Sequence, residues 1–187
     1  MRIIAGTHRG RALTPVGQGD ANAHLRPTTD RIRETIFNIL IGGRVGVDLQ
    51  DAVIADVFCG TGAMGLEALS RGASLAQFVD NGRVALGLVQ QNITLLKEGD
   101  RSAVIKADAR QMPPLKTPAD VVFLDPPYGT GLGEVALERM ITTQSLRDGA
   151  VIVFEDNAPA PALPSVQILD QRSYGGTVVS FLQKRPH

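Results

Sequence analysis

The sequence has few of the features that mark secreted, membrane-spanning or metal-binding proteins. Its 187 residues include one cysteine, Cys59, so no disulfide can form within the chain, as is usual in a reducing cytoplasm. No stretch approaches the ~20 apolar residues of a membrane helix, and the first residues lack the apolar core of a secretory signal. His8, His24 and His187 share no ligand spacing with one another or with the cysteine. We therefore expect a cytoplasmic protein without a membrane anchor or a metal site.

The formal net charge is zero, which argues against a general polyanion binder, but the charge is unevenly distributed. Residues 1–33 carry six arginines and two aspartates, a net charge of +4, so the remaining residues sum to −4. The arginines are Arg2, Arg9, Arg11, Arg26, Arg31 and Arg33. Because the guanidinium group makes forked contacts to phosphate, this arm is typical of a surface that binds RNA or DNA. A solvated surface segment is the alternative interpretation.

The order of apolar runs predicts an α/β fold. Residues 3–6 and 11–13 favour a short hairpin, residues 16–24 favour a loop, and a helix is expected from Thr28 or Thr29 to Gly42. Strands and helices then alternate. Strands are predicted at 53–58, 75–79, 103–106, 121–124, 150–154, 166–169 and 177–182, and helices at 63–71, 84–97 and 132–141.

Such alternation predicts a mostly parallel sheet with helices on both faces. Only a turn at Tyr174, Gly175 and Gly176 separates the last two strands, so these two strands should pair antiparallel. We divide the chain into a small basic N-terminal arm, residues 1–27, and one α/β domain, residues 28–187.

The strand predicted at 53–58 leads into a glycine-rich turn. A glycine lets the backbone pass close to a ligand, and Gly60, Gly62 and Gly65 match the G-x-G-x-x-G dinucleotide fingerprint. That match alone is a weak signal. A nicotinamide cofactor and a tight turn without a ligand both stay open. Cys59 lies in this turn, and we interpret it as a small packing residue rather than a nucleophile.

Acidic residues stand at or near the ends of four successive predicted strands: Asp56, Asp80, Asp108 and Asp125. An acid after the second strand can accept both hydroxyls of a ribose. An acid after the third can accept a hydrogen from an adenine amino group, although a helix cap explains Asp108 equally well. We expect one crevice that holds a nucleoside cofactor on one side and an amine on the other.

The segment Asp125-Pro126-Pro127-Tyr128 directly follows the apolar run 121–124. Proline fixes φ and keeps the preceding residue extended, so the segment forms a stiff lip at the carboxyl end of a strand. Open α/β sheets bind ligands at that edge. A carboxylate, free carbonyls and an aromatic ring suit a planar molecule with an NH2 group. A proline-rich turn with a solvated aspartate is the alternative.

Together these motifs resemble class I S-adenosylmethionine-dependent methyltransferases, whose Rossmann-like fold has a seven-stranded, mostly parallel sheet with an antiparallel last strand. Residues 125–128 resemble the signature of enzymes that methylate exocyclic amines of bases. Residues 2–11, 26–40 and 60–73 resemble the RsmD family. That resemblance implies methylation of the N2 amine of guanine 966 in 16S ribosomal RNA.

The resemblance also implies roles for the matching positions. The methionine part of the cofactor is expected near Asp56, Cys59, Gly60, Thr61 and Gly62. The nucleoside part is expected near Asp80, Asn81, Asp108 and Ala109, with Phe37 and Asn38 closing over the cofactor. The catalytic lip is Asp125, Pro126, Pro127 and Tyr128: the first two would hold the amine, and the tyrosine would stack on the base.

The implied reaction is direct displacement at a sulfonium methyl group, with S-adenosylhomocysteine as product and no metal. The implied partner is 16S rRNA, which we expect to be presented in an assembled or assembling small ribosomal subunit, because a chain of zero net charge is poorly suited to naked RNA. Three rivals stay open: a DNA adenine-N6 or other base-amine methyltransferase, a nicotinamide-dependent oxidoreductase, and a non-catalytic RNA-binding module. The oxidoreductase would leave the two prolines of the lip unexplained.

Overall fold

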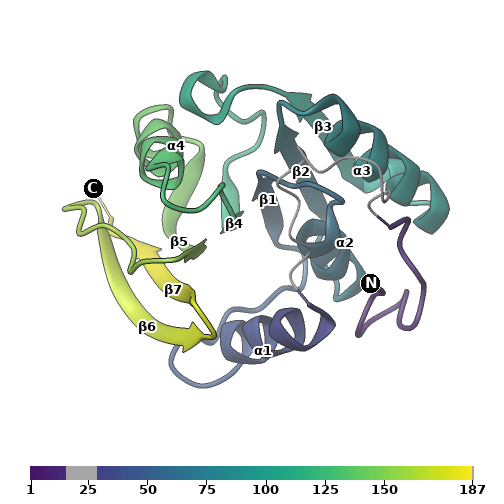
Figure 1. Ribbon diagram of the computed structural model, residues 1–187, viewed down its shortest axis with the longest axis horizontal. Helices are drawn as coiled ribbons and strands as arrows, with labels where there is room; N and C mark the ends of the chain where they lie inside the picture. The colour runs from purple at the N-terminus through teal and green to yellow at the C-terminus, as the bar shows by residue number, and fades with distance from the viewer. Residues whose placement is uncertain (16–28, 187) are drawn as a thin grey trace.

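The computed structural model describes residues 1–15 and 29–186. The predicted loop 16–24, Arg26, Thr28 and the boundary between residues 27 and 28 lie outside these ranges. Seven strands form one sheet in the order β3-β2-β1-β4-β5-β7-β6 (Figure 1). The strands are β1 (Val53–Val57), β2 (Leu75–Asp80), β3 (Ser102–Lys106), β4 (Ala119–Leu124), β5 (Leu146–Asp156), β6 (Val166–Tyr174) and β7 (Thr177–Lys184).

The pairing confirms the predicted parallel sheet with an antiparallel last strand. Strands β1 to β5 pair parallel to one another, whereas β7 pairs antiparallel to both β5 and β6. The chain starts at the centre with β1, moves outward through β2 and β3, and returns to the other side of β1 with β4. Such a reversal leaves a crevice at the carboxyl ends of the two central strands, β1 and β4.

Helices cover both faces of the sheet, as Figure 1 shows for α4 on one side and α1 and α2 on the other. Helices α1 (Asp30–Ile41), α2 (Ala63–Ser70) and α3 (Arg83–Leu96) share one core cluster with alternate residues of β1 and β4, including Ile54 and Phe123. Helix α4 (Leu132–Thr142) packs in the second cluster with the intervening strand residues. Side chains that alternate along a strand therefore divide the core into two layers.

Helix α1 has the ends that the sequence predicts. The Thr29 hydroxyl accepts a hydrogen bond from the N–H of Ile32 at 3.3 Å, and the Gly42 N–H donates to the Asn38 carbonyl at 3.0 Å. A side-chain oxygen at this position satisfies one of the free amides of the first turn. Among the described residues, no helix has the length and apolar character needed to cross a membrane.

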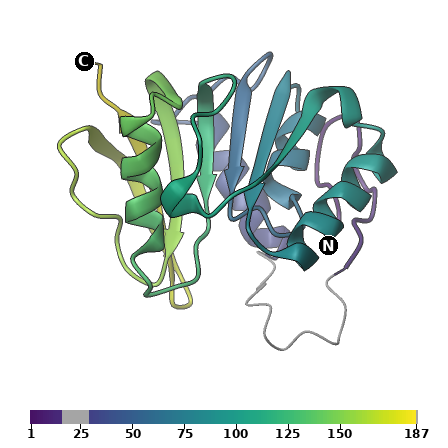
Figure 2. The same cartoon turned by 90° about the horizontal axis from the view of Figure 1, so that it is seen from above.

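The described part of the basic arm packs against the domain. It forms the predicted hairpin, with a bridge between Arg2 and Ala12, and runs beside α3 (Figure 2). The buried Glu67 carboxylate of α2 accepts the N–H groups of Ile4 at 2.8 Å and Ala5 at 3.0 Å. These contacts place the arm next to the helix that follows the glycine-rich turn.

Candidate active site

The glycine-rich turn leaves β1 with an unusual backbone. Phe58 has a φ of 62°, Gly60 of 54° and Gly62 of 77°, all in the left-handed region. The Asp80 carboxylate at the end of β2 accepts the N–H of Gly60 at 3.1 Å. The second strand therefore holds the turn of the first, and two predicted cofactor residues contact each other directly.

Two glycines of the fingerprint have a packing role. A Cβ atom at Gly62 would lie 2.5 Å from Cγ2 of Val89, and one at Gly65 would lie 2.4 Å from Cε1 of Phe78. Both distances are too short for real side chains, so close contact of α2 with β2 and α3 is sufficient to require glycine there. Packing alone therefore favours glycine at position 62. The sequence analysis explained this glycine only by the approach of a ligand.

A small pocket opens beyond this turn, at the carboxyl ends of β1, β2 and β3. Four predicted cofactor residues, Asp80, Asn81, Asp108 and Ala109, line it together with Phe58 and Leu132. Asp108 also caps the 3-10 helix η2 (Ala109–Gln111) by accepting the N–H of Arg110 at 2.9 Å. The Arg110 side chain hydrogen-bonds the same carboxylate and lowers the pKa of Asp108 to about 2. The helix cap weighed as an alternative is therefore present, on the wall of the pocket.

Three carboxylates lie near this edge of the sheet: Asp56 on β1, Asp125 directly after β4, and Glu155 on β5. Asp56 of β1 pairs in register with Phe123 of β4. Leu124 of β4 pairs with Phe154 of β5, so the residues that come next, Asp125 and Glu155, lie at the same level. The alternation of side chains points all three toward the layer of α1, α2 and α3.

The surroundings of these carboxylates favour their protonated forms. Burial raises the pKa of Asp56 to about 8, although the hydrogen bond from the Gly65 N–H lowers it, and the charges of Asp125 and Asp80 add to the increase. Burial and the charge of Asp156 raise the pKa of Asp125 to about 7. The pKa of Glu155 is raised well above its usual value by burial and by the charges of Asp125 and Asp56. A bound ligand with positive charge would stabilise the ionised forms of these carboxylates.

The lip is held in place from both ends. Pro126 is buried and Pro127 is exposed, with the Pro127 carbonyl accepting the Thr130 hydroxyl at 2.6 Å. The Tyr128 hydroxyl lies 3.1 Å from that of Thr177 at the start of β7, and burial raises the pKa of Tyr128. The half-buried ring of Tyr128 thus links the end of β4 to β7 at the same edge as Asp125.

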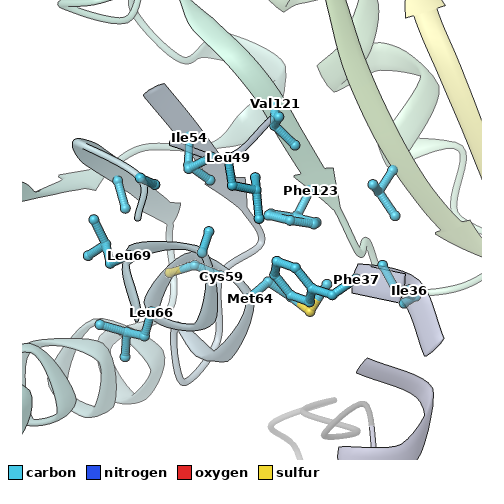
Figure 3. Packing of buried hydrophobic residues seen from close by; sticks show 14 of the residues in the cluster. Ile36, Phe37, Leu49, Ile54, Cys59, Met64, Leu66, Leu69, Val121 and Phe123 are labelled. Atoms are coloured by element: carbon cyan, nitrogen blue, oxygen red, sulfur yellow. The ribbon is translucent and has the colours of Figure 1, made fainter. Parts of the chain in front are cut away.

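Two predicted site residues are buried, and these predictions are wrong for the described conformation. Phe37 is fully buried, with its ring centre 5.5 Å from that of Phe123 (Figure 3), so it cannot close over a cofactor. Arg33 is also fully buried, and its guanidinium donates to the carbonyl of Arg2 and to Asp30. The helical face that holds both residues turns inward.

The other predicted positions are exposed or lie in the turn. The exposed set is Asn38, Arg2, Arg9, Arg11 and Arg31. Cys59 is buried in the core cluster, and burial, with the charges of Asp56 and Asp80, raises the pKa of its thiol well above the usual value. Its environment is that of a packing residue. Within the described ranges, no group of three or more His, Cys, Asp or Glu side chains is arranged to hold a metal ion.

The end of β5 carries two acidic residues that are absent from the predicted site. Glu155 and Asp156 directly follow the apolar run 150–154, so the rule applied to the other strand ends also selects them. Asp156 accepts the N–H of Gly129 at 3.1 Å and so supports the lip. Thr177 carried no signal in the sequence, because only the antiparallel return of β7 brings it to Tyr128.

Comparison with known proteins agrees with this geometry. A family model described as conserved hypothetical protein 95 matches residues 1–183. The ribosomal RNA small subunit methyltransferase D of Escherichia coli K12 is 37% identical over 99% of this chain and 90% of its own length. Its counterpart in Haemophilus influenzae is 34% identical over 87% of this chain and 82% of its own. The chain belongs to this family, the RsmD family.

Solved structures support the RsmD-family fold. The E. coli protein yhhF, described as a proposed methyltransferase, is 31% identical and superimposes with a TM-score of 0.84 over 100% of this chain and 99% of its own. HI0767 of H. influenzae, described as a proposed methylase, is 30% identical and superimposes with a TM-score of 0.75 over 99% of this chain and 98% of its own. The Rossmann-like class I methyltransferase fold expected from the sequence is confirmed.

Proposed function

We propose that this protein transfers a methyl group from S-adenosylmethionine to the exocyclic N2 amine of a guanine in 16S rRNA of the small ribosomal subunit. The observation that carries the proposal is the position of the Asp125–Tyr128 lip beside the turn that follows Asp56, at one edge of the sheet. The names of the family relatives support ribosomal RNA as the substrate. The exocyclic amine is supported by the chemistry of the lip.

The pocket suits a nucleoside cofactor. Asp80 at the end of β2 is available to ribose hydroxyls, and Asp108 with the backbone of Ala109 is available to an adenine edge. Asp56 is buried and Asp125 is half-buried, and the raised pKa of each carboxyl group favours a ligand that brings positive charge. S-adenosylmethionine would supply a sulfonium-bound methyl group that is open to attack by a nitrogen lone pair.

The residues of the lip orient the amine. In the transfer, a new N–C bond would form at the amine while the C–S bond broke with its electrons moving to sulfur, and the positively charged nitrogen would then lose one proton to solvent. Asp125 and the Pro126 carbonyl would accept the two amine hydrogens, which keeps the nitrogen lone pair free and offsets the charge developing on it. Alignment of this kind contributes about 7–11 kcal/mol of barrier lowering.

The base must leave its stack to reach the lip. The ring of Tyr128 would stack on it, and Thr177 keeps that ring in place through its hydroxyl. The exposed arginines of the arm and of α1 offer contacts to RNA phosphates. Since the net charge is zero, we expect the assembled or assembling small subunit, in the cytoplasm, to be a better substrate than naked rRNA.

The test is transfer of a labelled methyl group to small ribosomal subunits, naked rRNA and DNA in parallel, followed by identification of the modified nucleoside. We expect N2-methylguanosine from the subunits. N6-methyladenosine from DNA would instead support the base-amine rival, and binding of rRNA without any transfer would support the RNA-binding module.

A variant separates chemistry from binding. Asp125→Ala should reduce turnover at least about 100-fold, because an acceptor aimed at a developing charge is removed. Calorimetry should still detect S-adenosylmethionine binding. Glu138→Gln, on the exposed face of α4, is the matched control and should retain full turnover. Wild-type turnover by Asp125→Ala would contradict the assigned role.

A further inference from the structure

Two carboxylates at the lip lack hydrogen-bond donors. Among the described residues, no N–H or O–H group donates to the side chain of Asp125 or of Glu155, although only 4% of Glu155 is exposed. No oxygen of either residue is among the described buried atoms that lack a partner, so these carboxylate oxygens are accessible from outside the protein. Asp156, one residue further along β5, does have donors in Gly129 and Asn157. The two unpartnered acids are therefore candidates for contact with a ligand that brings its own donors.

The position of Glu155 places it on the base side of the crevice. The strand order β1-β4-β5-β7 puts Asp125 between the glycine turn after β1 and Glu155 on β5. On its other side, β5 pairs with β7, which carries Thr177, the partner of Tyr128. Glu155 is also close enough to Tyr128 for its charge to affect the tyrosine hydroxyl. Asp125, Glu155 and Tyr128 thus lie near one another at the ends of β4, β5 and β7, away from the pocket at the ends of β1, β2 and β3.

Neighbouring strands lie about 4.8 Å apart, so the two carboxylates present two acceptors side by side. The pairing edge of guanine has two adjacent donors, the N2 amine and the N1–H. Adenine and cytosine each present one amine next to a ring nitrogen that accepts. The two donors of guanine would favour the ionised form of a second carboxylate beside the amine site. Such a carboxylate accepts only, so it would match guanine and would repel the ring nitrogen of the other two bases.

We infer that Glu155 accepts the N1–H of the target guanine while Asp125 holds its N2 amine, which makes Glu155 a specificity-determining residue. This inference rests on the proposed function and extends it, since it explains how the site selects guanine. It also accounts for the acidic end of β5, which a lip that binds the amine alone does not require.

The probe is 2-aminopurine, which keeps the exocyclic amine of guanine but has an accepting nitrogen in place of the N1–H. Small subunits are reconstituted with guanine or 2-aminopurine at the nucleotide that the wild-type protein methylates. The wild-type protein should prefer guanine by at least about 100-fold in kcat/KM, because a site built around a donor rejects an analogue that lacks it.

The Glu155→Gln variant should reduce that preference to about tenfold or less, because the amide can donate to the ring nitrogen as well as accept. A purely structural role for Glu155 would lower kcat/KM for both bases equally and leave the ratio unchanged. Glu138→Gln serves as the surface control, and calorimetry with S-adenosylmethionine shows that each variant is folded.

Two results would overturn the inference. One is an unchanged guanine preference in a folded Glu155→Gln protein. The other, which needs no variant, is wild-type methylation of 2-aminopurine within about threefold of guanine, a difference too small for a lost buried hydrogen bond. If the wild-type protein methylates no guanine N2 in any RNA, the proposed function itself is contradicted and the inference falls with it.

Discussion

The side-chain amide of Asn92 donates to the backbone carbonyl of Thr61 at 2.9 Å. Asn92 is fully buried on α3, and its side-chain oxygen accepts the N–H of Thr14 in the arm at 2.7 Å. One side chain therefore ties the N-terminal arm to the glycine-rich turn. A contact made by the arm and the shape of the cofactor turn depend on the same buried amide.

Replacement of Asn92 by alanine should affect both sides of this link. The loss leaves the partly buried N–H of Thr14 and the buried carbonyl of Thr61 without this partner, and a buried group without a partner costs about 1–3 kcal/mol. We expect a lower melting temperature and weaker S-adenosylmethionine binding, measured by calorimetry. Gln91→Ala is the control, because the adjacent side chain on the same helix is exposed. Equal cofactor affinity in the two variants would show that the turn does not depend on Asn92.

Two glycines of the arm allow backbone strain to be separated from a clash. Gly6 and Gly10 have nearly the same φ, 80° and 82°. A Cβ atom at Gly6 would lie 1.7 Å from the carbonyl oxygen of Ser70. At Gly10, no heavy atom of the described residues would lie within 4 Å of such a Cβ. Gly10→Ala should cost about 1–2 kcal/mol from the left-handed conformation alone.

Gly6→Ala should destabilise the protein by clearly more, because the arm must also move away from α2. Chemical denaturation of both variants measures the difference. Proteolysis near the N-terminus should be faster in Gly6→Ala. Similar stabilities for the two variants would show that the arm is free to leave the domain.

Stability should depend on pH through Asp56. The pKa of this group rises from 3.8 to about 8 on folding. The folded state therefore holds the proton longer, so the contribution is complete below the unfolded pKa and is lost as the pH rises through about 8. The Asp56→Asn variant has an uncharged side chain at this position at every pH, so its stability lacks this pH-dependent contribution.

Melting temperatures of the wild-type protein and Asp56→Asn should be compared from about pH 5 to pH 9. The wild-type value should fall relative to the variant as the pH increases. Asp100→Asn, at an exposed position, is the control and should run parallel to the wild type. A constant difference between wild type and Asp56→Asn would contradict the raised pKa.

Tyr128 allows stacking and hydrogen bonding to be tested separately. Tyr128→Phe keeps the ring and loses only the contact to Thr177, so we expect a small increase in KM for the RNA substrate. Tyr128→Ala removes the stacking surface, which is equivalent to about 1–3 kcal/mol of base binding. Steady-state kinetics should show the larger KM increase for alanine. Equal effects of the two changes would assign the role of Tyr128 to its hydroxyl.

Local patterns in the sequence predicted most of the fold. The central strands β1, β2 and β4 are buried on both faces and consist mostly of apolar residues. Their predicted ends therefore lie within two residues of the observed ends. The extents of β5 and of the edge strand β6 were predicted less completely. Strand β5 begins at Leu146 rather than 150 and β6 continues to Tyr174 rather than 169, because their additional residues are mostly polar and exposed. An edge strand needs no continuous apolar run.

The sequence by itself determined the chemistry of the strand ends, since Asp56, Asp80, Asp108 and the Asp125–Tyr128 lip are properties of short segments with stiff or glycine-containing backbones. Only the tertiary structure decided which side chains meet. Burial turned Arg33 and Phe37 inward, and the pairing of β5 with β4 brought Glu155 beside Asp125. Contacts between distant segments depend on strand order and register, and these are set by packing of the whole sheet rather than by any local run of residues.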